Sequence, residues 1–130
     1  MIKTNIRIIG AGPAGLYCAL TLLKAGYSVD LYDHMSGPLK KFLIAGHSGL
    51  NITHGEDLEK FISRYQSDKP ELFSQLIKSF TPLMMRGFYS ELGAESFVGT
   101  SGRVFPKEMK AGKILIAWME KLNEFSDFKF

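Results

Sequence analysis

The sequence has little cysteine and no long hydrophobic run. Its one cysteine, Cys18, cannot form an internal disulfide, which is typical of proteins from reducing compartments. Cys18 lies within a predicted helix, where we expect it to be a small packing residue. The first apolar run, residues 6–9, is interrupted by Arg7 and is too short for a signal peptide or a membrane span. We therefore expect a cytoplasmic protein with no membrane partner.

The chain also lacks a block of positive charge. Its 16 lysines and arginines are interleaved with 13 acidic residues, and the net charge is only +3. Proteins that bind nucleic acids usually concentrate positive charge in one patch, so we expect no nucleic-acid partner. The three histidines, His34, His47 and His54, lack the spacing of a metal site and have no cysteine partners, so we expect no metal.

The chain does contain enough apolar residues for one modest folded domain. Hydrophobic residues make up 45% of its 130 residues, and the 10 phenylalanines argue against disorder. Residues 6–9 and 29–33 have the composition of strands. Between them, residues 13–25 carry apolar side chains at helical spacing, and Gly26 follows as a C-terminal cap. We therefore predict an α/β fold that begins with a Rossmann-like βαβ unit.

The turn between the first strand and the helix carries a G-x-G-x-x-G motif. Gly10 permits a tight turn, Gly12 lets the backbone approach a pyrophosphate, and Gly15 lets the helix pack closely on the sheet. Pro13 suits the first helical turn, and the N-terminus of the helix attracts phosphate groups. The motif, in this context, predicts a dinucleotide-binding site.

An acidic residue follows where such a site requires one. Asp33 ends the second predicted strand, where a carboxylate accepts hydrogen bonds from a ribose 2′-OH and repels the 2′-phosphate of NADP. A glycine-rich turn that binds no nucleotide is the alternative interpretation. FAD and NAD share the same ADP half, so these residues alone do not separate the two cofactors.

The next segment, residues 34–55, is rich in glycine, and we expect a long loop with little regular structure, as in many ligand-binding loops. Lys40 and Lys41 either neutralise phosphates, lie near a flavin, or are solvated surface lysines. Residues 46–51 either lie against a flat ring system or form a plain surface loop. The candidate cofactor-binding residues are Gly10, Ala11, Gly12, Pro13, Ala14, Gly15, Asp33, His34, Lys40, Lys41, Gly46, His47, Ser48, Gly49 and Asn51.

The rest of the chain predicts further helices and a hairpin. We expect Met84 and Met85, with the aromatic residues around them, to lie in the core. Residues 128–130 resemble the start of another strand, and a doubly wound sheet needs more than one βαβ unit. We therefore expect residues 1–130 to be the N-terminal part of an FAD-binding Rossmann-type domain in a longer protein. The predicted elements are helices at 58–65, 70–80, 82–93 and 114–122 and a β-hairpin at 97–105.

Three stretches of the sequence resemble one known family. Residues 8–16, with Tyr32 and Asp33, resemble the FAD-binding form of the glycine motif, which many flavoproteins share. Residues 41–54 and residues 101–111, which contain Ser-Gly-Arg-Val-Phe-Pro, are more specific. Together they resemble the BaiN-like flavoproteins, bacterial NAD(P)/FAD-dependent oxidoreductases also described as aminoacetone-oxidase-type enzymes.

This resemblance implies an FAD-dependent oxidoreductase with a small-molecule substrate, and NAD(P)H as a reductant in the complete enzyme. It implies that the glycine motif holds the pyrophosphate, that Asp33 holds the adenosine ribose, and that residues 40–51 approach the flavin. Family members usually carry glutamate at the position of Asp33, and Gly-Arg-Lys where residues 39–41 are Leu-Lys-Lys. A lysine contact there is less directional than an arginine contact.

The residues leave two other functions open. One is a non-catalytic nucleotide-binding fragment that lacks a complete flavin site. The other is an NAD-dependent dehydrogenase. No residue of the chain has the arrangement of a nucleophile and its base, so the catalytic residues are not identified.

Overall fold

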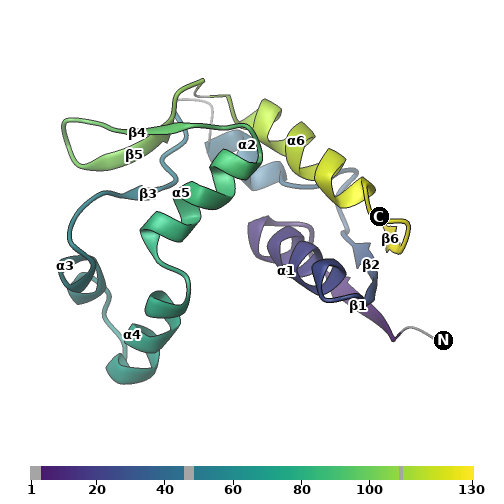
Figure 1. The fold of residues 1–130 in the computed structure, drawn as a ribbon, viewed down its shortest axis with the longest axis horizontal. Helices are drawn as coiled ribbons and strands as arrows, with labels where there is room; N and C mark the ends of the chain where they lie inside the picture. Colours follow the sequence, from purple (N-terminus) through teal and green to yellow (C-terminus); the bar gives the residue numbers. More distant parts are fainter. Residues whose placement is uncertain (1–3, 46–48, 109) are drawn as a thin grey trace. The chain divides into compact units, whose positions relative to one another are not determined.

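The computed structural model describes residues 4–45, 49–108 and 110–130 (Figure 1). The chain forms two compact units: residues 1–48 with 110–130 make the first, and residues 49–109 make the second. Mixed α/β structure with parallel strands in the first unit confirms the predicted fold class. No helix among the described residues is long and apolar enough to cross a membrane.

The first unit is built on a parallel three-stranded sheet in the order β1-β2-β6. The apolar residues of the strands alternate, so that one face of the sheet can be covered. Val29 and Leu31 of β2 are buried, and Val29 pairs with Ile6 on one side and Phe128 on the other. The strands are β1 (Asn5–Ile9), β2 (Ser28–Tyr32) and β6 (Phe128–Lys129).

Two long helices of this unit each bury one apolar face. The helix α1 (Pro13–Lys24) contacts β1 and β2 and buries the four apolar residues that helical spacing predicts, Leu16, Ala19, Leu20 and Leu23. It ends before Gly26, whose φ of +87° suits a glycine cap. The helix α6 (Ala111–Asn123) contacts α1 and buries Ala111, Ile114, Trp118 and Leu122.

The second unit combines three helices with a small antiparallel sheet in the order β3-β5-β4. Asp57 and Thr81 cap two of the helices: their side chains accept hydrogen bonds from backbone N–H groups of the first turn. Burial raises the pKa of Tyr89 to about 12. The elements are α3 (Leu58–Ser63), α4 (Pro70–Ser79), α5 (Pro82–Glu91), β3 (Thr53–His54), β4 (Ser96–Val98) and β5 (Arg103–Pro106).

Three expectations from the sequence are wrong in detail. Residues 34–55 are not one irregular loop, because they contain the short helix α2 (Lys40–Ala45) and the strand β3. Cys18 is exposed on α1, because its position lies outside the buried stripe of that helix. Met84 is 49% exposed, because α5 buries its other face, which carries Phe88 and Tyr89.

The close packing of α1 on the glycine turn generates a test of the fold. A Cβ atom added at Gly15 would overlap the carbonyl oxygen of Gly10, whereas one added at Gly112, in α6, would meet nothing within 4 Å. We expect Gly15→Ala to lower the free energy of unfolding by about 1–3 kcal/mol. Gly112→Ala is the matched control and should raise it by about 0.5–1 kcal/mol. Urea unfolding of both variants checks this, and equal effects would contradict the packing of Gly15.

Candidate functional site

The glycine turn after β1 has the backbone that a dinucleotide requires. Gly10 has a φ of +109°, in the region that favours glycine, and its N–H donates to the carbonyl oxygen of Tyr32 at 2.7 Å. Gly12 is the N-cap of α1, and a Cβ atom there would meet nothing within 4 Å. The space in front of Gly12 is therefore open, at the positive end of a twelve-residue helix.

The Asp33 carboxylate ties the end of β2 to this turn. Its Oδ2 accepts a hydrogen bond from the backbone N–H of Ala11 at 2.6 Å, and its Oδ1 accepts one from Met35 at 2.8 Å. These hydrogen bonds from Met35 and Ala11 hold the pKa of Asp33 below its ordinary value of 3.8. Oδ1 also lies 3.4 Å from Nδ1 of His34, so Oδ2 is the oxygen that keeps an acceptor position for a ligand hydroxyl.

Leu39 holds the next peptide group of the turn. Its backbone N–H donates to the carbonyl oxygen of Ala11 at 2.8 Å, and its side chain is buried. Among the residues that the structure describes, Leu39 is the non-glycine residue with a positive φ, which is 56°. Both backbone polar groups of Ala11 are therefore hydrogen-bonded, one to Asp33 and one to Leu39, and these bonds restrain the two peptide groups that flank Ala11.

These residues line a cavity of about 250 Å³ within the first unit. The structure brings together seven of the residues predicted from the sequence and adds four that the sequence reasoning missed. The added four lie between residues 35 and 42, shortly after Asp33 in the chain. Their proximity to Asp33 in the sequence was the signal that could have identified them as site residues. The predicted members are Ala11, Gly12, Pro13, Asp33, His34, Lys40 and Lys41, and the added members are Met35, Gly37, Leu39 and Phe42.

The other predicted residues lie elsewhere. Gly10, Ala14 and Gly15 adjoin the cavity along the chain but do not line it. Gly46, His47 and Ser48 lie outside the described residues. Gly49 and Asn51 belong to the second unit. Which of the predicted residues contact a cofactor stays a prediction.

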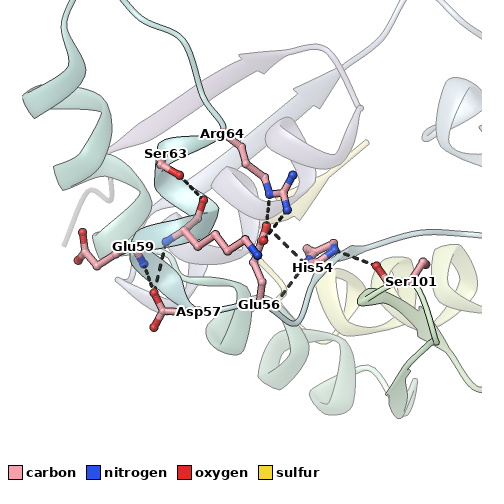
Figure 2. Close-up of polar contacts among 8 residues, drawn as sticks. His54, Glu56, Asp57, Glu59, Ser63, Arg64 and Ser101 are labelled. Atoms are coloured by element: carbon pink, nitrogen blue, oxygen red, sulfur yellow. Dashed lines mark hydrogen bonds and ion pairs between the residues drawn. The ribbon is translucent and has the colours of Figure 1, made fainter.

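The second unit holds a polar cluster that sequence reasoning missed: His54, Glu56, Arg64 and Ser101, shown in Figure 2. Arg64 donates to both carboxylate oxygens of Glu56, from Nε at 2.6 Å and from Nη2 at 2.7 Å. This contact lowers the pKa of Glu56 and raises the pKa of Arg64. A glutamate and an arginine eight positions apart, on a loop and after a short helix, give no recognisable spacing in the sequence.

His54 is held by both of its ring nitrogens (Figure 2). Nδ1 lies 3.2 Å from the backbone nitrogen of Glu56 and 3.4 Å from its Oε1; in the tautomer where Nδ1 accepts from this N–H, the proton of the neutral ring is on Nε2. Nε2 then donates to the carbonyl oxygen of Ser101 at 3.2 Å. A Cβ atom at Gly102 would collide with the ring, so the imidazole packs directly on the turn between β4 and β5.

The cavity of the first unit suits the ADP half of a dinucleotide. It has an open glycine at a helix N-terminus for a pyrophosphate, an ionised carboxylate for a ribose, and two lysines for negative charge. Comparison with known proteins agrees with this geometry. Residues 4–127 match the family described as "HI0933-like protein Rossmann domain".

The chain belongs to this family. The match confirms the resemblance predicted from the three sequence motifs, and it supports a Rossmann-type chain that binds a dinucleotide. A ribosomal RNA dihydrouridine synthase of Haemophilus influenzae is 32% identical over 101 residues, which cover 78% of this chain and 24% of the relative. This HI0933-like chain thus spans about a quarter of the length of that relative.

A solved structure shows the same fold. The crystal structure of Thermovibrio ammonificans THI4 superposes with a TM-score of 0.57 at 16% sequence identity. The similarity covers 98% of this chain and 37% of the THI4 chain. At this identity the likeness supports the arrangement of the elements and not a shared substrate.

The Glu56–Arg64 ion pair generates a prediction about pH. The pKa of Glu56 in the folded protein lies below its ordinary value of 4.5, so the pair stabilises the fold above that value and loses its effect as the pH falls through the lowered pKa. We expect Glu56→Gln to lower the free energy of unfolding at neutral pH, and the difference from the parent protein to shrink as the pH falls below 4.5.

Urea unfolding at several pH values measures this difference. Glu59→Gln is the control, because Glu59 is 72% exposed in its ion pair with Lys78, and exposed pairs contribute little. A pH-independent effect of Glu56→Gln would show that the charge of Glu56 does not stabilise the fold.

Proposed function

We propose that this HI0933-like chain binds the ADP part of FAD in the first unit, as part of a flavin-dependent oxidoreductase. One observation carries the proposal: the Asp33 carboxylate, the open face of Gly12 and the two lysines line one cavity. FAD is favoured over NAD by the sequence motifs at residues 41–54 and 101–111, which resemble those of BaiN-like flavoproteins.

Each part of the cavity has a separate task in this proposal. The N-terminus of α1 and the open side of Gly12 receive the pyrophosphate. Asp33 accepts a hydrogen bond from the adenosine ribose with the remaining acceptor position of Oδ2. Lys40 or Lys41 neutralises phosphate charge, and the apolar side chains of the cavity contact the adenine.

The bound flavin supplies hydride transfer, and the protein supplies binding, orientation and electrostatics. The ionised Asp33 keeps the glycine turn fixed before the ligand arrives, so little ordering cost remains on binding. We further propose NAD(P)H as the reductant and a small molecule as the substrate of the complete enzyme.

A second candidate substrate comes from the relative in Haemophilus influenzae, whose name states that it is a ribosomal RNA dihydrouridine synthase. Reduction of uracil to dihydrouracil adds one hydride and one proton across the C5=C6 bond, which is chemistry that a reduced flavin supplies. We propose uracil as the alternative substrate. Mass spectrometry of ribosomal RNA from cells that lack the gene tests this alternative. Loss of a dihydrouridine would support uracil as the substrate. Unchanged RNA would reject uracil in favour of a small-molecule substrate.

Two substitutions test the binding of FAD. Gly12→Val should leave the fold intact, because its backbone is extended and its Cβ meets no neighbour, but should block the pyrophosphate and abolish FAD binding. Asp33→Ala should weaken FAD binding by about 1–3 kcal/mol. Asp30→Ala is the control, because Asp30 lies on β2, the strand that ends just before Asp33, and bonds to Asn5 instead.

Flavin fluorescence quenching during titration of the 130-residue protein measures the affinity. Unchanged affinity in both variants would place the cofactor elsewhere. Binding of NAD in preference to FAD would identify an NAD-dependent protein, and binding of FAD with no turnover would identify a non-catalytic nucleotide-binding chain.

A further inference from the structure

A second cavity, of about 340 Å³, lies within the second unit. It is formed by the segment before and along β3, by α3 and the residues just after it, by the end of α4 and by the start of α5. Its volume falls in the range of about 300–1,000 Å³ typical of small-molecule sites. The residues of its wall that matter for recognition are Asn51, Thr53, His54, Phe61, Tyr65 and Phe80.

Tyr65 gives this cavity a platform for a flat ring. Its side chain is 47% exposed, yet it is held by two aromatic neighbours: Phe61 at 5.3 Å between ring centroids, edge to face, and Phe73 at 5.1 Å. An aromatic side chain that is fixed by neighbours and still accessible offers a surface on which a planar heterocycle can stack.

Asn51 supplies a polar edge to the same cavity. Its side chain is exposed and makes no hydrogen bond to another residue that the structure describes. A carboxamide presents an acceptor and a donor side by side. The N3–H and O4 groups of uracil present the complementary pair, so one Asn51 side chain can make two hydrogen bonds to that edge.

The wall of the cavity is rigid and carries no permanent charge. His54 is fixed on both ring nitrogens by Glu56 and Ser101 (Figure 2), and the N–H of Ile52 donates to Val104 at 2.9 Å. Among the described residues that line the cavity there is no lysine, arginine, aspartate or glutamate. A preformed, uncharged site favours a neutral ring over a phosphate or a carboxylate group.

We propose that this cavity binds a neutral pyrimidine base, with the ring stacked on Tyr65 and its amide-like edge paired with Asn51. The proposal deepens the second candidate function above and rests on it for the identity of the base. The ring can come from a free nucleotide or from a uridine in RNA, and both present the same edge and face.

Titration of the isotope-labelled full chain with uridine 5′-monophosphate tests the site by NMR. We expect the amide signals of Asn51, Thr53 and Tyr65 to shift. Tyr65→Ala should weaken binding by about tenfold or more, and Tyr65→Phe should retain it, because the ring and not the hydroxyl group stacks. Tyr27→Ala, at a 40% exposed tyrosine of the first unit, is the control and should bind as the parent protein does.

Asn51→Ala is a second test that should not disturb folding, because Asn51 is exposed and lies outside the helices and strands. This substitution should lower the affinity for the nucleotide while the protein stays folded. If a uridine-containing RNA oligonucleotide shifts the same signals and binds more tightly than the nucleotide, RNA is the source of the base. If only the free nucleotide binds, a nucleotide is the source of the base. Unchanged affinity in both the Tyr65→Ala and Asn51→Ala variants would overturn the proposal, as would shifts confined to residues around Gly12 and Asp33. FAD titration of the Gly12→Val and Asp33→Ala variants reports on the first unit, so failure of either proposal is recognised by itself.

Discussion

Asp33 accepts a hydrogen bond from the backbone N–H of Ala11 at 2.6 Å, and the geometry of the first cavity depends on this contact. The bond joins the end of β2 to the turn that follows β1. The carbonyl oxygen of Ala11, in the next peptide group, accepts a hydrogen bond from Leu39. Since the two peptide groups that flank Ala11 are each held by one hydrogen bond, neither can rotate away from its position without breaking that bond.

The residues after β2 are held by the same turn. Leu39 adopts a φ of 56°, which is costly for a residue with a branched side chain, and its burial offsets that cost. The chain then turns directly into α2, which begins at Lys40. Lys40 and Lys41 follow Leu39 directly in the chain, and both line the cavity.

The sequence predicted the βαβ unit closely, because its elements depend on local patterns. The buried stripe of α1, the cap at Gly26 and the positions of Gly10 and Gly15 all follow from spacing and backbone freedom. The two contacts that fix the turn could not be predicted, because they depend on a positive φ at Leu39 and on which amide a carboxylate reaches. The His54 cluster was missed because Glu56 and Arg64 have no recognisable spacing and His54 meets Ser101 only in the folded chain.

A crystal structure of the chain with FAD tests the central claim most directly. The account predicts the pyrophosphate within hydrogen-bond distance of the backbone amides at the start of α1, beside Gly12, with a ribose hydroxyl on Asp33. The Asp33–Ala11 bond should be present in the complex as well. An ADP group bound away from Gly12 and Asp33, with their cavity still open, would contradict the account.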